Sequence, residues 1–319
     1  MTWLDIENFK SIKKLNIKTK RVNIFIGEPN SGKSNILEAL FLVSMNSSEF
    51  ISDIMRGDDI GNIAHDANFN MPIHMKSDVI GFEISQNPND SSFKIQYSSE
   101  STIMATARFG SNIEIYNLDN TFDTNVKFYN YQNINDFKQD HRPFLSPPFG
   151  QNLPTLLLGN SEFKKIVSHI FRDKDLRLVM KPVSSEIEIV KDKDDELYSY
   201  PYSTTSETLR RYAFMRLAIE SNKESILVLD EPEANTFPFY SKMTAELIGK
   251  DSSNQYFIST HSPYLLMSLI EKTPTKDLNI IKTEMVNFET KATVLDPETY
   301  GDMLETGSDI FYELEKLGK

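Results

Sequence analysis

The sequence predicts an α/β fold with a parallel sheet, and three observations support this prediction. A short β-rich run at residues 22–26 leads into a glycine-containing loop, and residues 35–45 then carry apolar side chains at helical spacing. Two further apolar runs, at residues 225–230 and 255–260, end in polar residues. Strands of this buried kind are typical of parallel sheets, whose ligands bind at the carboxyl ends of the strands.

Composition narrows the class of protein. The chain has 319 residues, of which 39% are hydrophobic and 11% aromatic, which suffices for one large domain or two closely joined ones. The absence of Cys excludes disulfides and thiolate chemistry, and five dispersed His residues form no zinc pattern. No apolar run approaches the roughly 18 residues of a membrane span, and the acidic start resembles no signal peptide. We therefore expect a cytoplasmic protein with no membrane partner.

The loop after the first strand reads Gly-Glu-Pro-Asn-Ser-Gly-Lys-Ser, which fits the phosphate-binding pattern of nucleoside triphosphatases. In such a loop the backbone N–H groups and the helix N-terminus cradle the α and β phosphates. We expect Lys33 to reach the β and γ oxygens and the Ser34 hydroxyl to bind Mg²⁺. The residues of this loop expected to bind ATP are Gly27, Asn30, Ser31, Gly32, Lys33 and Ser34.

The second half of the predicted site lies about two hundred residues further along. Asp230 can hold the Mg²⁺ shell, and Glu231 can orient and deprotonate the attacking water, with Glu233 as the next candidate base. His261 follows the third strand, where a histidine can sense the γ-phosphate. Together with the phosphate loop, these residues predict a Mg²⁺-dependent ATPase.

The remaining elements are read from periodicity and turn signals. We divide the chain into an N-terminal part of the head at 1–130, an inserted arm of helix and loop at 131–175, and a C-terminal part at 176–319. Expected strands are 3–9, 15–19, 80–85, 93–98, 103–109, 112–118, 176–180, 186–190 and 278–281, with a hairpin at 287–289. Expected helices are 161–173, 209–219 and 309–317.

These motifs together resemble the ABC-type ATPase heads of the SMC, RecF and OLD group. The resemblance rests on the phosphate loop, on Asp-Glu-Pro-Glu-Ala-Asn at 230–235 and on Ser-Thr-His-Ser-Pro-Tyr-Leu at 259–265. The opening Asn-Phe-Lys-Ser is similar to that group's N-terminal turn, which implies nucleotide contacts for Lys10 and Ser11. The implied fold is a P-loop NTPase of the ABC-type ATPase head class, with an N-terminal antiparallel β-subdomain and a short inserted helical arm. In the implied mechanism, two heads form an ATP-dependent homodimer around two ATP molecules.

The signature segment departs from the family pattern. In that family a Ser-x-Gly stretch opens a helix and touches the γ-phosphate bound by the opposite subunit. Here Thr205 and Ser206 could supply hydroxyl and N–H groups, but Glu207 stands where glycine is expected. A carboxylate repels a triphosphate, so the departure predicts slow or partner-gated hydrolysis. The glutamine that usually follows the first long loop is not identifiable, although Asp66 or Asn68 could replace it.

Three functions are compatible with this chain. The first is a stand-alone head that serves as sensor or motor for a separate effector, for example a nuclease, in phage defence or DNA processing. The second is a RecF-like clamp on DNA, which the basic segment at 10–21 favours and the net charge of −12 disfavours. The third is the ATPase subunit of a membrane transporter. The segment after His261 is shorter than the Toprim nuclease domain of OLD-type proteins requires.

Overall fold

The computed structural model describes residues 1–44, 62–87, 92–99, 102–109, 115–118, 124–306 and 311. The helix expected at 309–317 lies outside these residues apart from Phe311.

A six-stranded sheet in the order β16-β15-β3-β14-β13-β9 forms the centre of the molecule. Its strands are β3 (Val22–Ile26), β9 (Val126–Tyr129), β13 (Ile226–Asp230), β14 (Gln255–Ser259), β15 (Leu278–Val286) and β16 (Glu289–Val294). All neighbours are parallel except β16, which turns back antiparallel against β15. The predicted parallel α/β core is confirmed.

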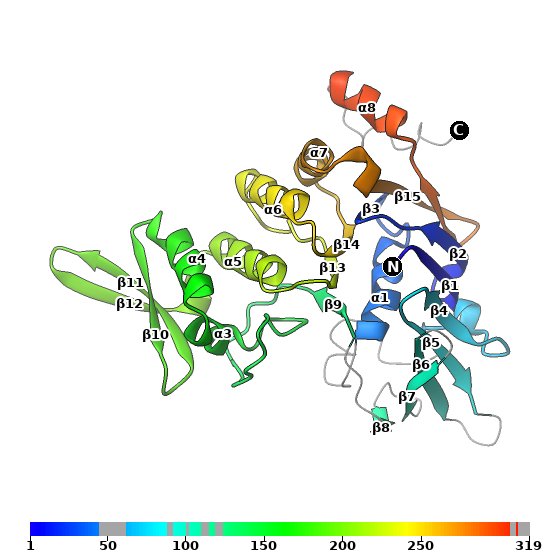
Figure 1. Ribbon diagram of the computed structural model, residues 1–319, viewed down its shortest axis with the longest axis horizontal. Helices are drawn as coiled ribbons and strands as arrows, with labels where there is room; N and C mark the ends of the chain where they lie inside the picture. The colour runs from blue at the N-terminus through cyan, green and yellow to red at the C-terminus, as the bar shows by residue number, and fades with distance from the viewer. Residues whose placement is uncertain are drawn as a thin grey trace.

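Helices cover both faces of this sheet because its strands are apolar on both sides. In β3, Val22, Ile24 and Ile26 pack into one core with α5, α6 and α7, whereas Phe25 points into a second core with α1. The helices are α1 (Lys33–Ser44), α5 (Glu207–Glu220), α6 (Pro238–Lys250) and α7 (Pro263–Lys272). Figure 1 shows α5, α6 and α7 side by side along the sheet, with α1 on its other side.

A seven-stranded sheet forms the expected N-terminal antiparallel β-subdomain, in the order β2-β1-β4-β5-β6-β7-β8. Its strands are β1 (Trp3–Phe9), β2 (Ile12–Lys18), β4 (Ile73–Ser77), β5 (Gly81–Gln86), β6 (Phe93–Ser99), β7 (Thr102–Phe109) and β8 (Ile115–Leu118). Every pair is antiparallel. Side chains of β1, β4, β5 and β6 share the second core with α1, so this sheet packs directly against the helix that follows the phosphate loop.

Residues 131–201, which include the predicted arm at 131–175 and the three strands after it, are called the arm from here on, and they project from the central sheet on the left of Figure 1. The arm contains α3 (Leu153–Gly159), α4 (Ser161–Arg172) and a three-stranded antiparallel sheet of β10 (Leu176–Lys181), β11 (Glu186–Lys193) and β12 (Glu196–Pro201). The side chain of Asn160 caps α4 by accepting from the N–H groups of Glu162 and Phe163. The arm is thus built from helix and sheet together, while the domain boundaries stay predictions.

One further helix, α8 (Pro297–Thr306), follows β16. Within the described ranges, no helix combines the length and the apolar character that crossing a bilayer requires.

Candidate functional site

Three loops meet at one edge of the central sheet. They follow β3, β13 and β14, which are neighbouring parallel strands, so their carboxyl ends point the same way. This edge therefore collects the phosphate loop, the acids Asp230 and Glu231, and His261. In open α/β sheets such an edge is where ligands bind.

The phosphate loop wraps around the ammonium group of Lys33. Lys33 begins α1, and its Nζ donates hydrogen bonds to the carbonyl oxygens of Gly27 and Glu28, both at 2.9 Å, and to Ser31 Oγ at 3.3 Å. The residue is only 4% exposed. The positive charge therefore lies inside the loop, where backbone oxygens and one hydroxyl satisfy it.

The β15–β16 hairpin supports the loop from behind. A Cβ atom on Gly32 would lie 1.9 Å from Thr290 Oγ1, and one on Gly27 would lie 2.3 Å from the carbonyl oxygen of Thr283. Gly32 also has a φ of +92°, in the region that favours glycine. The two glycines are required because the hairpin fills the space that any side chain would take. The Thr283 and Ser31 hydroxyls lie 2.8 Å apart, which joins hairpin and loop. Sequence reasoning missed both threonines, although the hairpin itself was predicted.

The last residue of β14, Ser259, positions the two acids at the end of β13. Ser259 Oγ donates to Asp230, and the N–H of Glu231 donates to the carbonyl oxygen and the Oγ of Ser259, at 3.2 and 3.1 Å. Glu231 has a φ of +46°, a strained backbone conformation for a residue with a side chain. The sharp turn directs its carboxylate toward His261, whose Nε2 lies 3.4 Å from Glu231 Oε1.

The pKa shifts of Lys33 and His261 show that these groups lie close enough to act on one another. Burial lowers the pKa of Lys33 to about 8, and the nearby carboxylates of Glu231 and Asp230 oppose the shift. Burial also lowers the pKa of His261, the charge of Lys33 acts in the same direction, and the two carboxylates again oppose it. The structure therefore brings together Lys33, Asp230, Glu231 and His261 at the carboxyl ends of three neighbouring strands.

Ser34 and Asp230 remain the expected ligands of a divalent cation. A hydroxyl and a carboxylate are oxygen donors of the type that Mg²⁺ prefers. Asp230 lies near enough to Lys33, the residue before Ser34, to change the pKa of the lysine. The donor set fits Mg²⁺.

Lys10 and Ser11 contact α1 and the β15–β16 hairpin, which lie next to the phosphate loop. Lys10 forms an ion pair with Glu38 of α1, and both side chains are largely buried. Ser11 Oγ accepts from Asn35 Nδ2 at 2.6 Å and lies 2.6 Å from Thr290 Oγ1. Glu38 was not foreseen as a partner of Lys10, and the nucleotide contacts expected of Lys10 and Ser11 stay predictions.

Thr205 and Ser206 lie on a different loop, just before α5. Thr205 Oγ1 donates to the carbonyl oxygen of Tyr202 at 2.7 Å, and Ser206 is the residue that precedes the helix. Glu207 accepts from Arg211 Nε at 2.8 Å, and this hydrogen bond lowers the pKa of Glu207. The carboxylate that departs from the family pattern is thus paired along its own helix.

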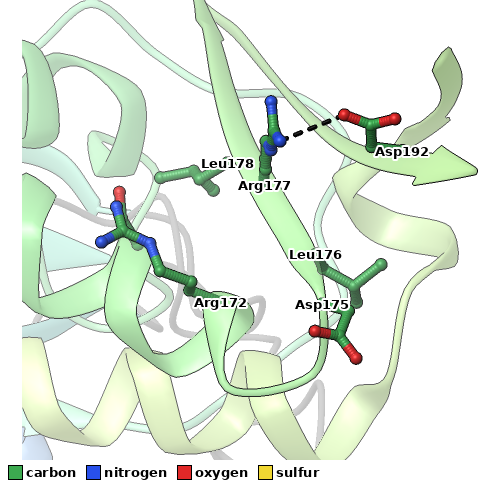
Figure 2. A pocket seen from close by; sticks show the side chains of 7 residues that line it. Arg172, Asp175, Leu176, Arg177, Leu178 and Asp192 are labelled. Atoms are coloured by element: carbon green, nitrogen blue, oxygen red, sulfur yellow. Dashed lines mark ion pairs between the residues drawn. The ribbon is translucent and has the colours of Figure 1, made fainter. Parts of the chain in front are cut away.

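A cavity of about 710 Å³ lies elsewhere, in the arm. Figure 2 shows Arg172 of α4 on one side of it and the ion pair of Arg177 with Asp192, at 3.1 Å, on another. None of the predicted site residues lines this cavity. The candidate site is the loop cluster at the sheet edge.

Comparison with solved structures identifies the same fold in SMC heads. The head bound to the C-winged helix domain of ScpA aligns over 94% of this chain and 99% of that chain, with 16% identity and a TM-score of 0.50. The SMC head domain from Thermotoga maritima aligns over 92% and 98%, with 16% identity and a TM-score of 0.44. An SMC head from Pyrococcus furiosus, bound to the C-terminal domain of ScpA, aligns over 96% and 98%, with 13% identity and a TM-score of 0.49.

No curated protein matches the sequence. A family model does match residues 22–268, which include the phosphate loop, the two acids at the end of β13 and His261. The chain has the ABC-type ATPase head fold of the P-loop NTPases, and it belongs to the family described as "AAA domain, putative AbiEii toxin, Type IV TA system".

Proposed function

We propose that this chain is a cytoplasmic head that binds ATP with Mg²⁺, dimerises around it and hydrolyses it to regulate a separate effector. One observation carries the proposal. Three neighbouring strands bring Lys33, Asp230, Glu231 and His261 to one edge of the sheet. The carboxylates of Asp230 and Glu231 act there on the pKa values of both Lys33 and His261. A phosphate-binding cation beside an acid pair is the arrangement that phosphoryl transfer to water requires.

The residues divide the work by their chemistry. Lys33 leaves its loop carbonyls to bind the β and γ phosphate oxygens, while Ser34 and Asp230 hold Mg²⁺. When bound, Mg²⁺ neutralises the charge that develops on the phosphates. Glu231 accepts the proton of the attacking water, and His261, with its lowered pKa, is neutral at pH 7 and can donate one hydrogen bond.

Phosphate release by the purified chain tests this reaction. We expect steady release from ATP in the presence of Mg²⁺ and loss of that release when the cation is chelated. Without the cation, the negative charge of Asp230 would face the triphosphate directly, so ATP binding should also weaken on chelation. A chain that neither binds ATP nor releases phosphate with Mg²⁺ would contradict the proposal.

The start of α5 supports the dimer. A helix N-terminus attracts anions, and Thr205 and Ser206 add hydroxyl groups there. Glu207 would repel the triphosphate, but its ion pair with Arg211 offsets that charge. We propose that this helix start completes the γ-phosphate site of a second copy.

Contacts between the arm and the start of α5 support the proposal that an effector controls hydrolysis. Arg210 of α5 donates to Asn133 of the arm, and the guanidinium of Arg211 lies 4.6 Å from the centre of the Tyr131 ring. Arg210 also donates to the carbonyl oxygen of Thr205 at 3.2 Å. A protein that moves the arm would therefore move the start of α5, which explains why hydrolysis would depend on a partner.

Binding of DNA stays a prediction. The basic side chains at 10–21 give it little support, because most of them already have partners within the chain. Lys13 pairs with Glu289 at 3.1 Å, and Lys14 pairs with Glu7. Lys20 and Arg21 donate hydrogen bonds to backbone carbonyl oxygens.

The pKa of Lys33 predicts how ATP affinity changes with pH. Below about pH 8 the free protein carries the charged lysine, and above it the proton must be taken up on binding. The affinity should therefore fall by only about twofold from pH 7 to 8 and then more steeply, approaching tenfold per pH unit. The terminal phosphate is already ionised in this range, since its pKa is about 6.

Equilibrium titration with a fluorescent ATP analogue between pH 7 and 10 measures this dependence. Lys33→Arg is the control, because arginine stays charged throughout. A constant affinity up to pH 10 in the unsubstituted protein would contradict the role of the Lys33 charge.

A further inference from the structure

Glu233 connects the loop after β13 to the loop after β14. Its Oε1 accepts from Thr260 Oγ1 at 2.5 Å and from the backbone N–H of His261 at 3.2 Å. Thr260 Oγ1 in turn accepts from the N–H of Ser262 at 3.0 Å. One carboxylate oxygen thus fixes three successive residues, 260–262, at the point where β14 ends and α7 begins.

The His261 side chain depends on this connection. Its ring is 38% exposed, and its close contact is with Glu231, whose side chain is 42% exposed. Side chains this exposed are not held by packing, so their relative placement follows from the backbone beneath them. That backbone is tied to Ser259 on the Glu231 side and to Glu233 on the His261 side.

The second oxygen of Glu233 indicates that the role of this residue depends on the position of its carboxylate and not on its charge. Oε2 is buried and has no hydrogen-bond partner in the part of the chain that the structure describes. Burial raises the pKa of Glu233 to about 7, although the hydrogen bonds from Thr260 and His261 lower it. A neutral side chain of the same length would keep the accepting oxygen, so the role depends on reach rather than on a full negative charge.

We propose that Glu233 is a positioning residue that holds His261 beside Glu231 by accepting the hydrogen bonds of Thr260 and His261. The kinetic consequence rests on the proposed hydrolysis of ATP at Glu231, whereas the placement of His261 does not.

Two substitutions separate reach from charge. Glu233→Gln keeps the length and removes the charge, whereas Glu233→Asp keeps the charge and withdraws the oxygen by about 1.5 Å, the length of one carbon–carbon bond. Both are small enough to preserve the fold. Glu246→Asp is the matched control, because Glu246 lies on α6 and pairs with the exposed Lys250 at 3.8 Å.

Steady-state hydrolysis provides the first readout. We expect Glu233→Gln to retain kcat within about threefold, because the acceptor oxygen stays in place. Glu233→Asp should lose kcat by about tenfold or more with KM changed less than about twofold, because displacement of a reacting group acts on the transition state. Glu246→Asp should match the unsubstituted protein. If the glutamine variant is as slow as the aspartate variant, the charge matters and the proposal is wrong.

The second readout needs no ATP. The imidazole ¹⁵N and ¹H signals of the five histidines can be recorded without nucleotide, and His261→Gln identifies those of His261. Glu233→Asp should shift the His261 signals and its titration midpoint, and Glu233→Gln should leave both close to the original values. His261 signals that are unchanged in Glu233→Asp would overturn the proposal. If the unsubstituted protein hydrolysed no ATP, the proposed function would fail, and these signals would still decide whether Glu233 positions His261.

Discussion

Lys33→Ala is expected to abolish tight ATP binding. The substitution removes the cation that the phosphate loop encloses with its own carbonyl oxygens. Hydrogen bonds to charged groups contribute about 1.5–3 kcal/mol, so the affinity should fall by roughly 10- to 100-fold or more. Titration calorimetry with ATP and Mg²⁺ measures this loss directly.

A lysine outside the site provides the control for Lys33. Lys250 is 78% exposed at the end of α6, and Lys250→Ala should bind ATP like the unsubstituted protein. Circular dichroism should show both variants folded, because neither lysine belongs to an apolar core and the Lys33 ammonium group bonds only within the phosphate loop. Wild-type affinity in Lys33→Ala would show that the loop does not bind the triphosphate.

Glu231→Gln is expected to suppress hydrolysis while ATP binding is retained. The amide can hold the attacking water, but it cannot accept its proton, and removing a general base typically costs 10²- to 10⁴-fold in rate. Because glutamine has the same size, the hydrogen bonds from the Glu231 N–H to Ser259 should survive. ATP affinity should change by less than about threefold.

Phosphate release and ATP binding must be measured on the same preparation of this variant. Glu246→Gln, on the exposed face of α6, controls for the loss of a carboxylate elsewhere. Undiminished turnover in Glu231→Gln would show that another group accepts the proton.

Local sequence signals were sufficient for the core of the fold. The glycine loop, the apolar runs that became β13 and β14, and the periodic helix α5 each carry their information within about fifteen residues. The strand β12 was not predicted because all its residues are exposed, so no alternation marks it. The strand β9 was missed because its four residues are too short a run to be distinguished.

In the site, too, local sequence signals predict some residues and miss those whose partners are distant in the sequence. The four residues that meet at the sheet edge were predicted because each belongs to a motif. Their supports were not, because Thr283 and Thr290 lie about 250 residues from the loop they contact. Glu233 was considered as a base, and only the structure shows which N–H and hydroxyl groups it accepts.

The dimer proposed for this head leads to the most direct measurement. Glu231→Gln should bind ATP without consuming it, so any dimer that ATP favours should accumulate by mass action. Because each chain has a mass of 36.6 kDa, sedimentation velocity with Mg²⁺ and ATP should show a species of twice that mass at micromolar concentration, and the single chain without ATP. A species that stays at 36.6 kDa with saturating ATP would contradict ATP-driven dimerisation of this chain.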